Sequence, residues 1–174
     1  YEEKQTEERV EKALWKHYCT LETFSTSTLY HAEDLPFSIK DIPDIFTSFR
    51  KKVEHDSSVR SVFEKPKAIK SPPIPLLTLP SFNELGLSES PVDPRAVIIF
   101  KGGETEGIRR VQEYFFTTKS ISTYKETRNA LLGKNNSSKF SAWLAQGCLS
   151  PREIYYEVRK YEEAFGANDS TYWL

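Results

Sequence analysis

The sequence has little of several residue types, and each shortage narrows the class of protein it can be. Its 174 residues include no methionine and only two cysteines, Cys19 and Cys148. Because these cysteines lie far apart and form no Cys-x-x-Cys unit, the sequence argues against a disulfide framework. Such cysteine usage is typical of an intracellular, reducing compartment, although it does not say which one. The histidines His17, His31 and His55 lack ligand spacing, so we expect no metal site.

An excess of charge of one sign and long apolar runs are also missing. The 24 basic and 25 acidic residues give a net charge of -1, so no overall positive field attracts nucleic acid. Any contact with DNA must therefore come from a local patch. No apolar run is long enough to cross a membrane, so we expect no membrane partner. With 38% hydrophobic and 28% charged residues, the composition is typical of a globular protein.

The two ends of the sequence read as cuts in a longer chain. It begins at Tyr1 instead of methionine and ends at Leu174, within an apolar, helix-like stretch. A natural domain rarely stops inside such a stretch, so we expect an internal fragment of a larger protein. Any signal or transit peptide would precede Tyr1, so its absence carries no information about location.

Residues 1–30 have the pattern of the end of an α/β domain. The charged stretch 1–16 carries apolar residues at helical spacing, which predicts a short amphipathic helix. The aromatic residues and threonines of residues 18–25 predict one strand. Because a single strand cannot form a sheet, its partners would have to lie earlier in the chain.

Residues 31–95 read as a connector. Nine of the ten prolines lie between Pro36 and Pro94, and prolines force extended backbone. Apolar residues at helical spacing between Ile42 and Val53 predict one helix within it. The connector is either a disordered linker or a segment that packs along the rest of the chain. The second interpretation is favoured by its apolar residues Leu76, Leu77, Leu79, Phe82 and Leu85.

Residues 96–174 predict an all-helical region. Apolar spacing and cap residues predict five helices: one opened by Gly102–Glu106, one over Thr123–Leu132, one beginning near Ser138, one beginning at Ser150-Pro151-Arg152-Glu153, and one capped by Asn168-Asp169-Ser170. The fourth start is the clearest, because it combines an N-cap serine, a proline at the first helical position and a capping box. The residues predicted to be buried are Ile108, Val111, Phe115, Phe140, Trp143, Leu144, Ile154, Val158, Tyr161 and Phe165. The expected fold class is mainly α, after the tail of a Rossmann-like α/β domain.

The run Ser137-Ser138-Lys139-Phe140-Ser141 is the first candidate for binding an anion. Hydroxyls and a lysine lie at a predicted helix start, where free N–H groups and the helix dipole favour a phosphate. Asn135 and Asn136, just before it, permit a tight turn. The alternative is an ordinary serine cap followed by a solvated lysine, and by itself the motif favours this alternative.

A second candidate group is basic and aromatic, and consists of Tyr124, Lys125, Arg128 and Lys139. Tyr124 and Arg128 are four residues apart, so they share one helix face, and such a face can hold nucleic-acid phosphates. The ordinary alternative is a solvated helix face. Gly102-Gly103 lacks the spacing of nucleotide-binding glycine motifs and reads as a turn. No catalytic triad or pair of carboxylates stands out, so no residue of the chain is assigned a catalytic role.

Several stretches, taken in order, resemble one family, the DASH type of the cryptochrome/photolyase family. They are Ser27–His31 with Asp34–Phe37, Gly102–Glu106, Tyr124–Asn129, Ser137–Ser141, Ala142–Arg152 and Asn168–Leu174. Each stretch is weak alone, but the ordered set spans nearly all of the sequence and overrides the ordinary interpretations of the candidate groups. The resemblance implies the remnant of an α/β antenna domain over 1–30, an interdomain connector over 31–95, and the N-terminal part of an all-α FAD-binding domain over 96–174.

The resemblance also implies which residues meet the cofactor. The family's helical domain holds FAD in a folded conformation, with its phosphates and ribityl chain near the first candidate loop. Arg128 matches a position that contacts DNA phosphate in photolyases. The residues that match FAD contacts are Tyr124, Ser137, Ser138, Lys139, Phe140, Ser141 and Trp173.

Family members often bind a second pigment, the folate 5,10-methenyltetrahydrofolate. In the family a carboxylate just after the fourth antenna strand serves this pigment, and the resemblance matches Glu2 or Glu3 to it. Ser137 stands where many photolyases have threonine, which preserves the hydroxyl group. The family's lesion-contacting and electron-transfer residues have no counterpart in the sequence, so catalytic residues are expected beyond Leu174.

For the parent protein the resemblance implies a deoxyribodipyrimidine photo-lyase. It would repair cyclobutane pyrimidine dimers with blue light, preferentially in single-stranded DNA and as a monomer, and the fragment alone would be inactive. One alternative is a blue-light receptor that signals through partners without repairing DNA. The other is a flavin-free, inactive scaffold. Lesion-contacting residues would distinguish the first alternative, and a yellow colour on purification would exclude the second.

Overall fold

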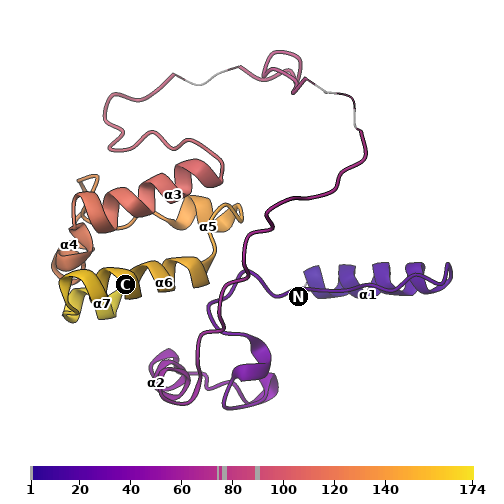
Figure 1. Ribbon diagram of the computed structural model, residues 1–174, viewed down its shortest axis with the longest axis horizontal. Coiled ribbons are helices and arrows are strands. Elements are labelled where there is room, and N and C mark those ends of the chain that lie inside the picture. The colour runs from indigo at the N-terminus through magenta and orange to yellow at the C-terminus, as the bar shows by residue number, and fades with distance from the viewer. Residues whose placement is uncertain (1, 74, 76–77, 89–90) are drawn as a thin grey trace.

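The N-terminal helix stands apart from the other helices. In the computed structural model, which describes residues 2–73, 75, 78–88 and 91–174, α1 covers Glu2–Trp15 (Figure 1). Two acidic residues in its first turn and Lys12 in its last turn complement the helix dipole. No residue of α1 is buried by the described chain. The helix predicted over residues 1–16 is confirmed.

The strand predicted over residues 18–25 is wrong, because the described residues form no β-strand. After α1 the chain turns at Tyr18, whose φ of 56° lies in the left-handed region. Leu21 and Thr23 then line a shallow hollow with Val10 of α1. A strand needs a neighbour that exchanges ladder hydrogen bonds with it, and within the described chain this segment has none.

The first half of the connector folds back on itself. Two short 3-10 turns, η1 (Ala32–Asp34) and η2 (Ile39–Asp41), precede α2 (Phe46–Asp56), which begins later than the apolar spacing predicts. Val53 is the buried residue of α2. Arg60 returns to η1, where it donates hydrogen bonds to both oxygens of the Asp34 carboxylate, at 2.6 and 2.9 Å. The pair closes a loop of the chain around α2.

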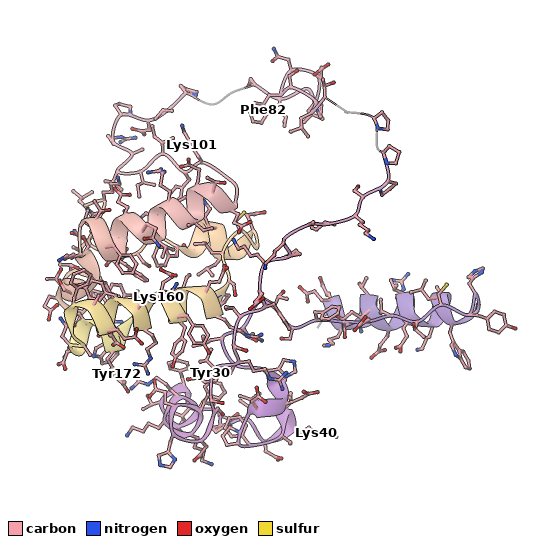
Figure 2. All side chains as sticks on the ribbon, viewed as in Figure 1. Tyr30, Lys40, Phe82, Lys101, Lys160 and Tyr172 are labelled. Atoms are coloured by element: carbon pink, nitrogen blue, oxygen red, sulfur yellow. The ribbon has the colours of Figure 1, made fainter. Side chains whose placement is uncertain are left out.

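Polar contacts also attach this half of the connector to the C-terminal helices. The Tyr156 hydroxyl donates to the Val59 carbonyl oxygen at 3.1 Å, and the Tyr172 hydroxyl donates to the Glu54 carboxylate at 3.0 Å. Figure 2 shows Tyr172 on the side of the helices that faces α2. The expectation that the connector packs along the rest of the chain therefore holds for its first half.

In the second half of the connector, from residue 66, the described residues around Phe82 lie away from the helices (Figure 2). Leu79, Phe82 and Leu85 were predicted to anchor it, but they are exposed. This prediction is wrong, because prolines break the regular repeat that would gather apolar side chains on one face. The predicted anchors Leu76 and Leu77 lie outside the described residues.

An aromatic core holds the helices after residue 100 together. α3 (Glu104–Gln112) continues into a π-helical turn, η3 (Glu113–Thr117). This wider turn brings Tyr114 and Phe115 into the interior, and both are 0% exposed. Phe165, which was predicted to be buried, is instead 48% exposed. The buried cluster consists of Val111, Tyr114, Phe115, Ile121, Phe140, Trp143, Leu149 and Tyr161.

Two of the predicted helices are shorter than expected. After a 3-10 turn, η4 (Ser120–Thr123), α4 covers only Tyr124–Thr127, and α5 covers only Ser141–Ala145. Residues 128–140 between them form a loop, where the sequence predicted helix to Leu132 and again from Ser138. The loop forms because its polar groups hydrogen-bond to Arg110 of α3, and such tertiary contacts override helical preference.

The last two helices differ in how they are capped. α6 (Pro151–Phe165) has proline at its first position, as predicted, but among the described residues the Ser150 hydroxyl caps no amide, so the predicted capping box is wrong. α7 (Asp169–Trp173) has a reciprocal box instead. The Asn168 side chain accepts from the Thr171 amide at 3.0 Å, and the Thr171 hydroxyl accepts from the Asn168 amide at 3.1 Å.

Within the described ranges, no helix is long and apolar enough to cross a membrane. The same residues include no group of three or more histidine, cysteine, aspartate or glutamate side chains placed to hold a metal ion. Cys19 is exposed and Cys148 is half-buried, and both are free thiols.

Candidate functional site

The candidate anion loop, residues 137–141, is anchored by one buried ring. Because α5 begins at Ser141, residues 137–140 form a loop and not the first turn of a helix. The Phe140 side chain is 4% exposed and packs edge-on against Tyr114 and Phe115, with ring centroids 6.0 and 5.7 Å apart. Lys139 has a φ of 60°, a left-handed conformation that is costly for lysine. Since the Phe140 ring is in the core, only its backbone can meet a ligand.

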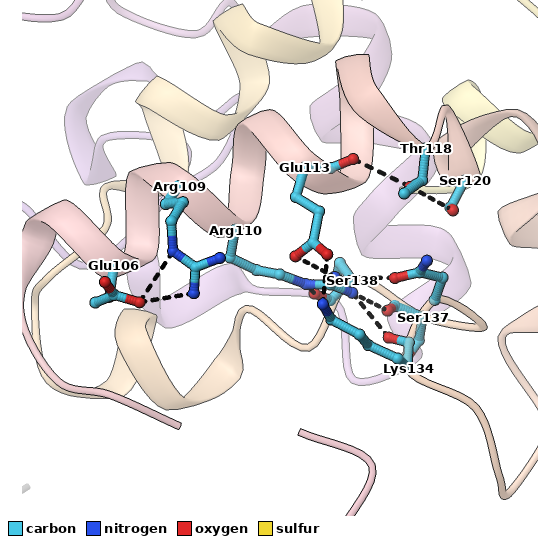
Figure 3. Close-up of polar contacts among 10 residues, drawn as sticks. Glu106, Arg109, Arg110, Glu113, Thr118, Ser120, Lys134, Ser137 and Ser138 are labelled. Atoms are coloured by element: carbon cyan, nitrogen blue, oxygen red, sulfur yellow. Dashed lines mark hydrogen bonds and ion pairs between the residues drawn. The ribbon is translucent and has the colours of Figure 1, made fainter. Parts of the chain in front are cut away.

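Arg110 of α3 holds one side of this loop. Its side chain is 2% exposed, and Figure 3 shows the guanidinium reaching the loop while Arg109 pairs with Glu106. Sequence reasoning missed Arg110, because adjacent arginines in an amphipathic helix give no sign of which one is buried. In the loop, the groups that accept its hydrogen bonds are the carbonyl oxygens of Ser138 (3.0 Å), Lys134 (2.8 Å) and Ser137 (3.3 Å) and the side-chain oxygen of Asn135 (3.0 Å).

Glu113 balances the charges beside this loop. One of its carboxylate oxygens accepts from Arg110 at 3.2 Å, and the other accepts from the Lys134 ammonium. The hydrogen bond from Lys134, together with that from Arg110, holds the pKa of Glu113 below its usual value, so the carboxyl stays ionised. Two cations and one anion leave this side of the loop positive, which favours an anionic ligand.

Donor groups without partners gather along the loop and α4. The hydroxyls of Ser137, Ser138, Ser141 and Tyr124 and the ammonium of Lys139 form no hydrogen bond or ion pair with any described residue. The backbone amides of residues 138–142 likewise bond to no described group. Hydroxyl, ammonium and amide donors are the groups from which phosphate oxygens accept hydrogen bonds. The donor set therefore fits a phosphate or pyrophosphate.

Tyr114 places another unpartnered donor behind the loop. Its side chain is 0% exposed, and its hydroxyl has no hydrogen-bond partner within the described chain. Burial raises the pKa of Tyr114 to about 12, so the phenol is neutral at ordinary pH. The Arg110 guanidinium lies 5.1 Å from the centroid of its ring. The described residues supply no acceptor for this buried donor, which is an uncommon situation for a buried polar group.

Two arginines flank Trp173, the candidate wall of the flavin pocket. The guanidinium carbon of Arg128 lies 4.9 Å from the Trp173 ring, and that of Arg50 in α2 lies 5.2 Å from it. Arg128 also lies 6.0 Å from the Tyr124 ring, so these two residues share a face, as their spacing predicts. Arg128, the candidate DNA residue, is therefore a neighbour of two candidate flavin residues, Tyr124 and Trp173. The sequence predicted the first neighbour but not the second.

The start of α7 fixes the start of α4. The buried Ser170 hydroxyl accepts from the Lys125 amide at 3.0 Å and donates to the Glu126 carboxylate at 2.8 Å. The Lys125 ammonium pairs with Asp169 at 2.7 Å, and this contact lowers the pKa of Asp169. Lys125 is therefore committed to a structural pair, unlike the other members of the predicted basic group. Sequence reasoning treated Ser170 only as part of a cap.

The two candidate folate residues lie elsewhere. Glu2 and Glu3 of α1 line the hollow that Leu21 and Thr23 also border. Figure 1 shows α1 separated from α3 to α7, so these carboxylates are not part of the loop site.

At the loop site, Thr127 of α4 donates to the Asn136 carbonyl oxygen at 2.8 Å and thereby ties α4 to the loop.

Comparison with known proteins covers nearly the whole chain. The profile of the DNA photolyase family matches residues 1–73. Cryptochrome DASH of Danio rerio is 47% identical over an alignment of 176 positions, which covers 99% of this chain and 34% of the relative. The Oryza sativa protein named cryptochrome DASH, chloroplastic/mitochondrial, is 46% identical over 155 residues, which cover 85% of this chain and 26% of the relative. The chain thus spans about a third of the length of the curated relatives it matches.

A solved structure shows the same arrangement. A crystal structure of a cryptochrome from Synechocystis sp. aligns with a TM-score of 0.89 and 46% sequence identity. The alignment covers 99% of this chain and 36% of that one. The likeness therefore includes the connector as well as the helices.

Proposed function

Because this chain belongs to the cryptochrome DASH family, we propose that it forms the phosphate side of a FAD site in a blue-light-driven DNA photolyase. The observation that supports the proposal is the set of donors along α4 and residues 137–141 that have no partner in the described part of the chain. These donors suit the pyrophosphate and the ribityl hydroxyls of FAD. The proposed contacts are the side chains of Tyr124, Ser137, Ser138, Lys139 and Ser141, the backbone of Phe140, and the ring of Trp173.

We assign the rest of the chain in the same framework. Residues 1–30 are the end of an α/β antenna domain, residues 31–95 connect the domains, and residues 96–174 begin the helical FAD-binding domain. Glu2 or Glu3 contacts a folate antenna, 5,10-methenyltetrahydrofolate. This carboxylate role is independent of the loop site, since α1 lies apart from it (Figure 1).

The proposed reaction is that of a deoxyribodipyrimidine photo-lyase. When bound, light-excited, reduced FAD supplies the electron that splits a cyclobutane pyrimidine dimer. Lys139 holds the cofactor through a charge-assisted contact with phosphate, and Arg128 contacts a DNA phosphate. Single-stranded DNA is the proposed substrate, because extruding a base costs least where pairing is already lost. No residue of this chain is assigned a catalytic role.

Two substitutions in the complete protein test these roles. Lys139→Ala is expected to lower the ratio of flavin to protein, because a hydrogen bond to a charged group contributes about 1.5–3 kcal/mol. Arg128→Ala is expected to keep its flavin and to weaken binding of single-stranded DNA, with a salt dependence smaller by about one unit of slope. Lys40→Ala, an exposed lysine in η2, is the control and should change neither property.

The outcomes separate the alternatives. Flavin loss in Arg128→Ala with unchanged DNA affinity would show that Arg128 faces the cofactor and not DNA. Unchanged behaviour of both variants would remove both assignments. A protein that keeps flavin but does not split dimers in single-stranded DNA under blue light would be a signalling receptor and not a repair enzyme.

A further inference from the structure

Arg109 and Arg110 are adjacent in α3 but face different surroundings. The Arg109 side chain is 62% exposed, and its one ion-pair partner among the described residues is Glu106, at 2.7 and 3.1 Å. The Arg110 side chain is 2% exposed, and four of its five hydrogen bonds go to residues 134–138. Burying a guanidinium is costly unless its donors are satisfied, so Arg110 is tied to the shape of this loop.

The hydrogen bonds of Arg110 decide which way the loop's peptide groups point. In a trans peptide the carbonyl oxygen and the N–H of the next residue point in opposite directions. The carbonyl oxygens of Ser137 and Ser138 point at the guanidinium, at 3.3 and 3.0 Å. The amides of Ser138 and Lys139 must therefore point away from Arg110, and they bond to no described group.

We propose that Arg110 is a positioning residue for the anion site, which turns the amides of Ser138 and Lys139 outward to bind the phosphates of the flavin. Arg110 itself touches no ligand in this arrangement. The inference rests on the flavin site proposed above, and it adds the group that keeps the site in its binding conformation. It also accounts for the left-handed backbone of Lys139, a conformation that needs surrounding contacts to hold it.

Only arginine suits this position. Its planar fork carries five N–H donors, and here Nε, Nη1 and Nη2 each reach a different part of the loop. A lysine keeps the charge but has three donors on one nitrogen, so it cannot hold the Lys134, Ser137 and Ser138 carbonyls together. Arg110→Lys therefore releases the peptide groups while it preserves the positive charge.

The test compares FAD with riboflavin, which has the same ring and ribityl chain but no phosphate. In the complete flavoprotein, Arg110→Lys is expected to weaken FAD binding about tenfold to a hundredfold, and to leave riboflavin binding unchanged. Arg109→Lys, the matched control, should change neither affinity. Both dissociation constants come from fluorescence titration of the apoprotein, and circular dichroism confirms the fold of each variant.

Equal loss of affinity for both flavins in Arg110→Lys would show a merely structural role and overturn the proposal, and so would an unchanged affinity for FAD. Lys139→Ala is measured in parallel. If it also leaves FAD affinity unchanged, the flavin site itself is wrong, whereas a loss in Lys139→Ala alone refutes only the role of Arg110.

If Arg110→Lys does not fold, Asn135→Ala removes one of the guanidinium's contacts. It should then weaken FAD binding by up to about tenfold without affecting riboflavin.

Discussion

The helices from residue 104 onward and the connector before them both carry many large apolar residues. The helices bury a cluster of them, whereas the described part of the connector buries only Val53. Phe115 and Tyr114 in the π-helical turn are 0% exposed, whereas Phe82 and Leu79 in the connector are 55% and 93% exposed. Composition therefore does not decide burial in this chain. The helices repeat apolar residues on one face, while prolines in the second half of the connector prevent such a face from forming there.

The connector itself divides into two halves that differ in the reach of their contacts. In the first half, the Arg60–Asp34 pair joins residues 26 positions apart. In the second half, the Arg95–Asp93 pair joins residues only two positions apart. A long-range contact closes a loop of chain, whereas a local contact only shapes a turn. We therefore expect perturbations of the sequence or of pH to disturb the folded structure most in the helices, less in the first half of the connector, and least in its second half.

The largest expected effect comes from the aromatic core. Phe115→Ala should lower the free energy of unfolding by about 3–5 kcal/mol, because it leaves a cavity among packed rings. Phe82→Ala should change it by less than about 0.5 kcal/mol, since that ring is mostly in water. Urea denaturation of both variants checks the comparison. Similar losses for the two would mean that the second half of the connector contributes to a shared core.

A smaller effect is expected where α7 fixes α4. Ser170→Ala removes the buried hydroxyl that bonds the Lys125 amide and the Glu126 carboxylate, so it should cost about 1–3 kcal/mol. Ser38→Ala is the matched control, because that hydroxyl bonds Asp41 at 2.6 Å on an exposed surface. Its effect should stay below about 0.5 kcal/mol. Equal effects, measured by urea denaturation, would contradict a structural junction at Ser170.

A still smaller effect is expected at the point where the connector enters the helices. The Trp143 indole N–H donates to the Lys101 carbonyl oxygen at 2.9 Å, and the indole ring packs on Phe100. Trp143→Phe keeps an aromatic ring and loses this hydrogen bond, so it should cost about 0.5–1.5 kcal/mol. Hydrogen exchange of residues 96–103 should quicken, while exchange of α6 stays unchanged. Faster exchange throughout α6 would show that the ring, and not the hydrogen bond, holds this junction.

The sequence predicted well those features that depend on a local repeat. α1, α3 and α6 lie where the apolar spacing places them, and Val111, Phe115, Phe140, Trp143 and Tyr161 are buried as expected. It failed where a contact between distant residues decides the structure. The strand over residues 18–25 lacks a pairing partner among the described residues, and α4 ends early because Arg110 holds the following loop.

The candidate site divides in the same way. The residue types of the loop and the face shared by Tyr124 and Arg128 follow from the sequence, because one is contiguous and the other is set by helical spacing. The burial of Arg110 and the placement of Trp173 between Arg50 and Arg128 do not follow, because each depends on packing between separate elements. The assignment of the loop residues and Trp173 to FAD, and of Arg128 to DNA, remains a prediction that the experiments above test.

The smallest expected effect is a response of the connector to acid. Hydrogen bonds from Arg60 hold the pKa of Asp34 below its usual value, and those from Arg95 do the same for Asp93. A lowered pKa in the folded state means that each contact is fully present above the carboxyl's ordinary pKa, about 3.9, and is lost as pH falls through the lowered value.

Loss of the Asp34 contact should open the loop around α2, whereas loss of the Asp93 contact should disturb only its own turn. NMR titration from pH 6 to 2 should therefore show backbone shifts in α2 that follow Asp34, and none in distant residues that follow Asp93. Arg60→Gln should raise the pKa of Asp34 and remove the acid response of α2, and an α2 response that persists in this variant would contradict the role of the pair.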